Sequence, residues 1–364
     1  MKISRYIEQK RDIYEKLLEC LENNENNEFL SEFLHIFSIL KKNNYQNSYY
    51  DELKILLRSI NQITSHHRYD TIFKENVSKL FQALYSEITN NFSNIKIYNF
   101  FKENKRVLHH LFETKIIKID ESIVDLIYNN DLIKFFYFDI KPLLSKSCQH
   151  SFEREIDQKE FKKKVEIGEN DSYICSLIRQ DLIEDFISYI HQNNINLSSE
   201  IKPSFFETNL FLIKNNKTSL IEYAAFFGSI QIFNYLISNN AELSPSLWLY
   251  AIHGNNAEII QILEDKNVQK NDSKCFKEAV KCHHNEIATY FLETSTQLSD
   301  DFKMKNGFRY YNFKFFSVDP KNQNSLLYAI KYDYFTIVKL LLETKMIDFN
   351  LIKDTKKITS LIFV

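Results

Sequence analysis

The chain is poor in the two residues that form tight turns and flexible linkers. Its 364 residues include only four glycines and four prolines. This scarcity excludes Gly-rich linkers and Pro-rich recognition segments, and it disfavours an all-β fold with many tight turns. The motifs G-x-G-x-x-G, G-x-x-x-x-G-K-[ST] and G-x-S-x-G are absent as well. The sequence therefore offers no Gly-rich motif for binding phosphate, and it gives no positive evidence for an enzyme.

Cysteines are few and scattered along the chain. The five cysteines are odd in number and contain no C-x-x-C pair. This pattern argues against both a disulfide framework and a zinc knuckle. A reducing compartment is the simplest interpretation.

Long apolar runs and an excess of one charge are also missing. No run approaches the roughly 18 apolar residues that a membrane span requires. The N-terminal stretch MKISRYIEQKRDIYEKLLE is charged and amphipathic, and it lacks the apolar core of a secretory signal. The formal net charge of −2 gives no electrostatic reason to expect a nucleic-acid or membrane partner. We therefore expect a soluble cytoplasmic protein.

A helix-pair pattern recurs in the second half of the chain. Each copy has an alanine, a turn-forming or polar residue four places later, and apolar residues eight and twelve places later. The alanines lie 27, 28 and 50 residues apart, and the last interval is close to two periods. Such self-similarity predicts stacked helix pairs. The alanines are Ala224, Ala251, Ala279 and Ala329; the turn residues are Gly228, Asn255, His283 and Asp333; the apolar residues are Ile232, Ile259, Ile287 and Ile337, then Leu236, Leu263, Phe291 and Leu341.

The pattern predicts two regions. Amphipathic helices are expected at about 4–22, 28–41, 49–63 and 72–90, within an N-terminal helical region at 1–150. Degenerate repeats in this region are an open alternative. A solenoid is expected at 168–364, with a soft boundary in the polar stretch 146–168. Cys175 is expected in the alanine position of a further copy, and ITSLIFV at the end resembles the opening of an incomplete repeat.

The repeated unit resembles a divergent ankyrin repeat, which carries a small residue, a turn glycine and aliphatic residues on its second helix. The phrases IEYAAFFGSIQIFNYL, SLWLYAIHGNN and KCHHNEIATYFL, with YICSLIRQDLIEDF and FRYYNFKFF, are similar to a large family of ankyrin-like proteins in protozoan parasites. The resemblance covers roughly residues 100–364. It implies an all-α helix-pair solenoid with an intracellular interaction role, and the family has no established activity.

Two features depart from the ankyrin pattern. The spacing of 27–28 residues is below the typical 33, which predicts that the hairpin between repeats is short or missing. The usual threonine-proline-leucine-histidine opening reads Thr218-Ser219-Leu220-Ile221 in one copy and Asn324-Ser325-Leu326-Leu327 in another.

The histidine pairs and the cysteines are better explained as surface, turn or packing residues than as metal ligands or catalytic groups. Adjacent histidines on a helix point about 100° apart, whereas chelation favours a spacing of three or four. Cys275 and Cys282 fall at packing positions, and no base is placed to activate either thiol. We therefore expect no metal, no cofactor and no catalytic residue. The histidine pairs expected at the surface or in turns are His66–His67, His109–His110 and His283–His284.

The most informative side chains are those expected on the concave face of the solenoid. In an ankyrin-like pair, the residue before the small residue and the residue two places after it face outward from the first helix. A row of tyrosines with interspersed charges is typical of binding surfaces, although tyrosines also pack between repeats. The expected row is Tyr223, Phe226, Tyr250, His253, Glu278, Lys281, Tyr328 and Lys331.

These observations predict a non-catalytic protein–protein interaction scaffold that uses this concave face. The alternative is an enzyme or small-molecule binder, with a pocket between the N-terminal helices and the solenoid. The expected partner is a protein, whose identity the pattern does not specify, and the oligomeric state is likewise unspecified.

Overall fold

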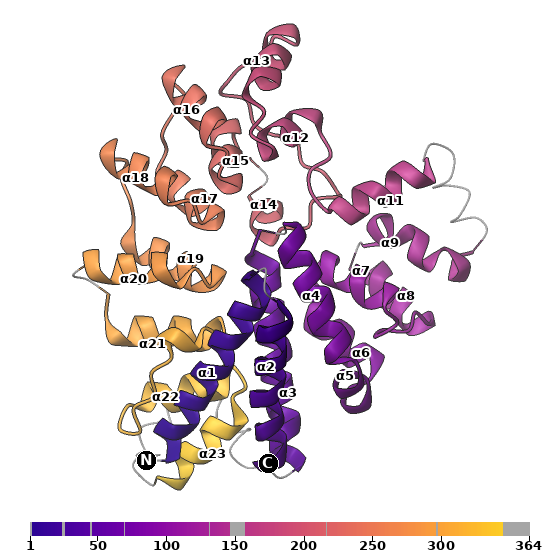
Figure 1. Cartoon of the computed structure of the whole chain (residues 1–364), viewed down its shortest axis with the longest axis vertical. Coiled ribbons are helices and arrows are strands. Elements are labelled where there is room, and N and C mark those ends of the chain that lie inside the picture. The colour runs from indigo at the N-terminus through magenta and orange to yellow at the C-terminus, as the bar shows by residue number, and fades with distance from the viewer. Residues whose placement is uncertain are drawn as a thin grey trace. The chain divides into compact units, whose positions relative to one another are not determined.

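The structure is a computed structural model that describes residues 2–23, 26–43, 46–68, 70–130, 132–145, 157–215, 217–295 and 298–344. Within these ranges the fold is all-α, as predicted (Figure 1). No β-strand occurs in them, and the single isolated bridge pairs Glu200 with Ser219. The described part of the chain thus lacks a hairpin finger between its repeats. Cys148 and the terminal ITSLIFV lie outside the described residues.

The chain divides into two compact units. Unit 1 combines Met1–Ile60 with Leu292–Val364, and unit 2 is Asn61–Phe291. These bounds differ from the expected division into 1–150 and 168–364. The units are defined by which segments pack together, whereas the expected division is based on where repeats can be recognised in the sequence. The sequence-based division remains a prediction.

Unit 1 joins helices from both ends of the chain. Helix α1 packs against α2, against the 3-10 turn η2 and against α23. The rings of Tyr14 in α1 and Phe313 in η2 are 6.0 Å apart, so early and late segments share one core. Its elements are α1 (Lys2–Glu22), α2 (Asn26–Asn43), the first part of α3 (Gln46–His66), α21 (Asp300–Arg309), η2 (Phe313–Phe315), α22 (Gln323–Lys331) and α23 (Phe335–Glu343).

Unit 2 begins with short helices, two pairs of which stack. Helix α6 packs against α8, and α7 packs against α9. Paired helices therefore occur within the expected N-terminal region, before the repeats that the sequence makes obvious. The elements are the end of α3, α4 (Thr71–Ala83), α5 (Tyr85–Asn91), α6 (Asn94–Phe101), α7 (Lys105–Glu113), α8 (Glu121–Asn129), α9 (Ile133–Ile140), η1 (Lys141–Leu143) and α11 (Gln158–Ile167).

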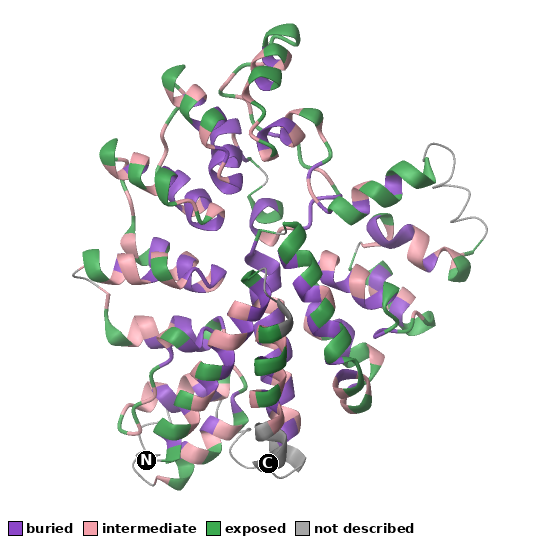
Figure 2. Cartoon of the chain, in the orientation of Figure 1, coloured by how far each residue is buried: buried purple, intermediate pink, exposed green. Residues whose placement is uncertain are grey.

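The rest of unit 2 is a row of helix pairs. The first helices stack in the order α12, α15, α17 and α19, and α13 packs against α16 among the second helices (Figure 1). Buried residues concentrate on the first helices, and exposed residues on the second helices (Figure 2). The elements are α12 (Tyr173–Arg179), α13 (Ile183–Gln192), α14 (Leu210–Lys214), α15 (Leu220–Phe227), α16 (Ile230–Ser238), α17 (Leu247–Gly254), α18 (Ala257–Asp265), α19 (Asp272–Cys282) and α20 (Asn285–Thr294).

Small residues allow the first helices to approach closely. Ala224, Ala251 and Ala279 have no exposed surface. A Cβ atom added at Gly254 would lie 2.3 Å from the carbonyl oxygen of Ala225, so the contact between α15 and α17 has no room for a larger residue there. The recurring alanines thus lie where the first helices of successive pairs pack against one another.

The four predicted turn residues all adopt the left-handed conformation. Their φ angles are 68° at Gly228, 48° at Asn255, 63° at His283 and 64° at Asp333. Glycine reaches this region without strain, and Asn, Asp and His tolerate it better than other residues do. The second helix begins two residues later in each copy, at Ile230, Ala257, Asn285 and Phe335.

The expected alignment of Cys175 is wrong by two residues. The left-handed residue of this copy is Asp181, six places after Cys175 instead of four. Leu177 is therefore the counterpart of Ala224. The buried residues of the second helix are Phe186 and Ile190, not Ile183 and Ile187 as the spacing predicted.

Candidate functional site

The expected concave row does not form one open surface. Tyr223, Phe226, Tyr250 and His253 are at most 4% exposed, so the prediction that they face solvent is corrected. Glu278 and Lys281 are partly exposed in α19. A role for these six residues in binding a partner remains a prediction.

The last two residues of the expected row, Tyr328 and Lys331, belong to unit 1, whereas the other six belong to unit 2. Tyr328 is partly exposed, and its hydroxyl donates to Asp301 at 2.9 Å. Lys331 is exposed. Any ligand of these two side chains would meet the surface of unit 1.

The insertion between α13 and α15 covers part of the row. Phe211 in α14 stacks on Phe226 with ring centres 6.1 Å apart, and its ring lies 4.8 Å from Tyr250 and 4.0 Å from His253. The sequence pattern favours a short helix over residues 204–211, after Pro203, but the helix begins only at Leu210 and residues 204–209 are not helical. Helical periodicity gave no sign of where Phe211 would pack. The packing of Phe211 is favourable because it removes the rings of the adjacent first helices from water.

The buried tyrosine hydroxyls are hydrogen-bonded inside the protein. The Tyr223 hydroxyl lies 3.0 Å from Nη1 of Arg179, which donates to it, and the Tyr250 hydroxyl lies 3.2 Å from the Thr218 hydroxyl. Burial raises the pKa of Tyr223 well above 10 and that of Tyr250 to about 12. Both phenols are neutral at physiological pH, and their partners hold them in place.

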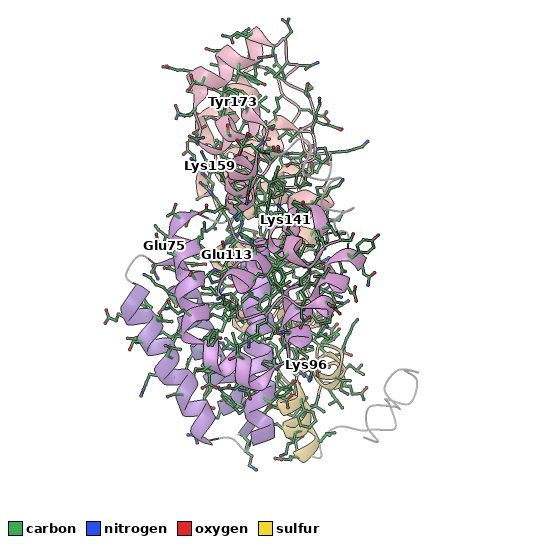
Figure 3. The ribbon with its side chains drawn as sticks, turned by 90° about the vertical axis from the view of Figure 1, so that its right-hand side faces the viewer. Glu75, Lys96, Glu113, Lys141, Lys159 and Tyr173 are labelled. Carbon is green, nitrogen blue, oxygen red and sulfur yellow. The ribbon has the colours of Figure 1, made fainter. Side chains whose placement is uncertain are left out.

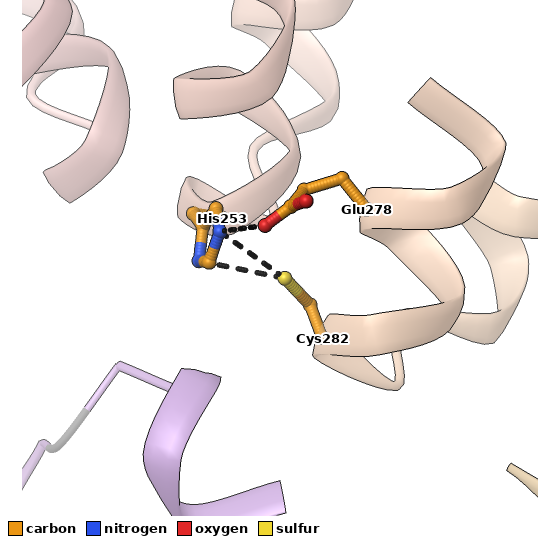
Figure 4. A group of neighbouring side chains, drawn as sticks. All are labelled: His253, Glu278 and Cys282. Carbon is orange, nitrogen blue, oxygen red and sulfur yellow. Dashed lines mark hydrogen bonds and ion pairs between the residues drawn. The ribbon is translucent and has the colours of Figure 1, made fainter. Parts of the chain in front are cut away.

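A buried polar cluster joins α17 to α19 (Figure 4). Nε2 of His253 lies 2.8 Å from Oε1 of Glu278. Sγ of Cys282 lies 3.4 Å from Nδ1 and 3.5 Å from Nε2 of the same ring. Glu278 and Cys282 are four residues apart on α19, so they project from the same side of the helix. The three side chains bring nitrogen, oxygen and sulfur donors within 4.8 Å of one another.

Burial and charge fix the protonation of this cluster. Burial is the largest influence on His253 and lowers its pKa. Burial alone would raise the pKa of Glu278, but the hydrogen bond with His253 and the charge of Lys281 hold it at about 2. Burial raises the pKa of Cys282 well above 9. The cluster at neutral pH is a neutral imidazole, a neutral thiol and a carboxylate whose Oε1 is 2.6 Å from Nζ of Lys281.

Histidines expected at the surface surround the cluster. His66, His67 and His284 are 5%, 7% and 8% exposed, so this expectation is corrected. His283 lies in the predicted turn but is also buried. His66 contacts the His253 ring edge-on at 6.1 Å, and His67 contacts His284 at 4.9 Å. The sequence signal that was available is the spacing of Glu278 and Cys282; their approach to His253 required the fold.

A cavity of about 310 Å³ lies beside the covered row in unit 2. Its wall includes Lys105 of α7, the segment 201–207, part of α14 and Tyr223. Phe205 and Ile213 are 45% and 38% exposed, and Lys202 is also exposed. The cavity thus has an apolar rim with a cationic side chain next to it. Pockets of this size are at the small end of ligand sites.

Two titratable groups of this cavity, Glu207 and Lys105, have hydrogen-bond partners inside the protein. Glu207 is 5% exposed, and its carboxylate accepts from the backbone N–H groups of Asn209 at 2.8 Å and Asn170 at 3.3 Å. Burial raises the pKa of this carboxyl group. Lys105 donates to the carbonyl oxygens of Phe205 and Glu207, both at 3.2 Å. These groups shape the cavity wall and are not free to transfer protons to a ligand.

A second cavity, of about 510 Å³, is lined by residues of α4, α7 and α11. Glu75 and Glu113 lie on its wall, and both are labelled in Figure 3. His109 lies between two carboxylates, with Nδ1 3.3 Å from Asp139 and Nε2 3.5 Å from Glu113. Burial alone would lower the pKa of His109, but Asp139 and Glu113 raise it above its usual value. The cavity wall therefore mixes acidic and basic groups.

Comparison with known proteins identifies one matching region. A family described as a domain of unknown function (DUF3447) matches residues 239–319. The matched region contains His253, Glu278 and Cys282. No curated protein and no solved structure matches the chain. Among the helices of the described ranges, none is long and apolar enough to cross a membrane.

Proposed function

We propose that this protein is a non-catalytic protein–protein interaction scaffold built from ankyrin-like helix pairs. The stacking of α12, α15, α17 and α19 supports this reading, because such arrays present extended surfaces on rigid helices. Fold alone is a weak basis for function. The observation that carries the proposal is the 310 Å³ cavity with its half-exposed apolar rim.

The chemistry of the cavity defines the partner. Phe205 and Ile213 offer apolar surface that a partner's aliphatic or aromatic side chain would cover. Lys202 has no ion pair within the described residues, so it is available to a carboxylate next to that side chain. The proposed ligand is a protein segment that combines an apolar anchor with an acidic residue. Tyr223 links this site to the concave row, since it lines the cavity.

Crosslinking tests the proposal at the level of single residues. A photoreactive phenylalanine at position 205 is expected to crosslink one protein from native lysate, identified by mass spectrometry. The same group at Tyr128, which is 65% exposed on α8, is the control and is expected not to crosslink that protein. Lys202→Glu and Ile213→Glu are expected to weaken capture at least tenfold, because they add charge repulsion and remove apolar contact.

Two outcomes contradict this function. One is equal crosslinking of the same proteins at positions 205 and 128. The other is unchanged capture by Lys202→Glu and Ile213→Glu variants whose circular dichroism matches the unmodified chain.

The second candidate is a small-molecule binder at the same cavity. Lys105 belongs to the expected N-terminal helical region, and the rest of the cavity wall comes from residues 170–223 of the expected solenoid. This cavity therefore suits the alternative hypothesis of a pocket between the N-terminal helices and the solenoid. Native mass spectrometry of the purified chain would then detect a bound ligand. Ile213→Trp, which fills the cavity, is expected to abolish that adduct, whereas Tyr128→Trp is expected to retain it.

A further inference from the structure

We propose that His253, Glu278 and Cys282 form a Zn²⁺ site that ties α17 to α19. Imidazole, thiolate and carboxylate are the three side-chain ligand types that zinc accepts in proteins. In this cluster they converge from two adjacent first helices, and His253 and Cys282 are at most 1% exposed. Neither the described family match nor the sequence pattern assigns a metal here, and the inference is independent of the proposed partner site.

The separation of Cys282 from His253 fits two ligands of a tetrahedral ion, and that of Glu278 requires a small movement. With Zn–N near 2.0 Å and Zn–S near 2.3 Å, the two ligand atoms of a tetrahedral site lie roughly 3.5 Å apart. A histidine offers one ring nitrogen to a given ion, and here Nε2 is the nitrogen that faces Glu278, whereas Nδ1 lies 3.4 Å from the backbone carbonyl oxygen of His66. Sγ of Cys282 lies 3.5 Å from Nε2. Oε1 of Glu278 lies 2.8 Å from Nε2, whereas the nitrogen and oxygen ligands of a tetrahedral zinc lie about 3.3 Å apart. The carboxylate oxygen must therefore move away from the ring by about 0.5 Å when the ion binds.

His66 is the candidate for the fourth position. Its side chain is buried, and its Nδ1 has no hydrogen-bond partner among the described residues. An unpartnered buried nitrogen is costly, which makes it a signal for an absent ligand. The ring centres of His66 and His253 are 6.1 Å apart, and two imidazoles on one tetrahedral zinc lie on the order of 5 Å apart. A shift of the His66 ring toward His253 by about 1 Å brings the two rings to that separation, which makes His66 the candidate for the fourth ligand.

Charge balance is favourable for a divalent cation. Zn²⁺ replaces the Cys282 thiol proton, which is released to solvent, and the resulting thiolate and the Glu278 carboxylate together neutralise the ion. Lys281 now pairs with Glu278, but its side chain is 20% exposed and can move toward water when zinc takes over that role. Before the metal binds, the same groups form the hydrogen-bonded cluster described above.

Metal titration of the full chain tests this site. The purified chain, stripped with a chelator under reducing conditions, is expected to bind one equivalent of Zn²⁺ and to gain thermal stability. With Co²⁺ as the probe, a thiolate-to-cobalt charge-transfer absorption is expected because Cys282 is a ligand. Cys282→Ser is expected to abolish that absorption. Cys275→Ser is the matched control, since this buried cysteine lies on the same helix outside the cluster, and it is expected to retain the absorption.

The remaining ligands are tested by affinity. Glu278→Gln, His253→Gln and His66→Gln are expected to weaken Zn²⁺ binding at least tenfold. The proposal is overturned if the unmodified chain binds no stoichiometric Zn²⁺, or if the two cysteine variants give the same cobalt spectrum. If Cys282→Ser does not fold, the titration of the unmodified chain and the His253→Gln affinity decide the question. Partner capture is not used as a readout, so failure here leaves the proposed scaffold function unaffected.

Discussion

At the scale of single residues, the partly buried His109 shows how neighbouring charges change the pKa of a side chain. Its imidazole lies between the carboxylates of Asp139 and Glu113, at 3.3 Å and 3.5 Å. Burial opposes protonation, yet the two carboxylates raise the pKa of His109 above its usual value. A raised pKa means that the folded state holds the proton more tightly than the unfolded chain does.

The first prediction concerns this titration. By NMR, His109 is expected to titrate with a midpoint above about 6.5, and Asp139→Asn is expected to lower that midpoint because it removes the nearer charge. Asp125→Asn, at an exposed position of α8, is the control and is expected to leave it unchanged. The free energy of unfolding contributed by His109 is fully present below about pH 6.5 and is lost as the pH rises through the folded pKa. A midpoint at or below 6.5 in the unmodified chain would contradict this account.

At the scale of elements, the start of α15 shows how one helix end is fixed to its neighbour. The Ser219 hydroxyl accepts from the backbone N–H of Glu222, and the Glu222 carboxylate accepts from the backbone N–H of Ser219 at 2.9 Å. This capping box satisfies N–H groups that have no partner inside the helix. The other oxygen of Glu222 accepts from the Ser246 hydroxyl at 2.5 Å, next to the start of α17. The cap therefore also positions the next repeat.

The second prediction separates these two roles. Ser219→Ala is expected to lower the free energy of unfolding by about 1 kcal/mol, which is typical for a lost N-cap. Glu222→Ala is expected to lower it further, because this variant loses its part of the capping box and also the hydrogen bond that Ser246 donates to Glu222. The measurement is urea unfolding followed by circular dichroism. Ser198→Ala, at an exposed loop position, is the control and is expected to stay within about 0.5 kcal/mol. Equal losses for Ser219→Ala and Glu222→Ala would rule out the linking role.

At the scale of the whole molecule, unit 1 depends on two distant parts of the chain. Glu52 is 1% exposed and pairs with the buried Lys10. Its carboxylate also accepts from the Tyr6 hydroxyl at 2.7 Å and from the Thr336 hydroxyl at 3.2 Å. Removing one partner of a buried ion pair is strongly destabilising, because the remaining charge has no compensation. The late helices of this unit therefore require the early ones.

The third prediction tests this dependence with fragments. Residues 61–291, which form unit 2 as one continuous segment, are expected to unfold cooperatively when made alone. A fragment of residues 292–364 is expected to have little helical signal by circular dichroism, and addition of a fragment of residues 1–66 is expected to restore it. A fragment of residues 1–66 carrying Glu52→Ala is the matched control and is expected to restore less. Full helicity of 292–364 in isolation would contradict this dependence.

The all-α class, the helix pairs and their turns follow from the amino-acid sequence without the coordinates. These features depend on residues only a few positions apart in the sequence. Each copy has an alanine, then Gly228 or an equivalent residue in the left-handed conformation, and then apolar residues at helical spacing. The prediction that Cys275 and Cys282 are buried is confirmed for the same reason. Where the local signal was ambiguous, as at Cys175, the alignment was wrong by two residues.

The residues that meet across the repeats, and those that remain open to solvent, are known only from the packing of the folded chain. Phe211 covers Phe226 and His253 although it lies in a different helix, and His66 reaches His253 across 187 residues of sequence. Helical periodicity states which side of a helix is apolar, but it carries no information about what packs on that side. The convergence of His253, Glu278 and Cys282, and the cavity beside Tyr223, arise from that packing and so could not be predicted from spacing alone.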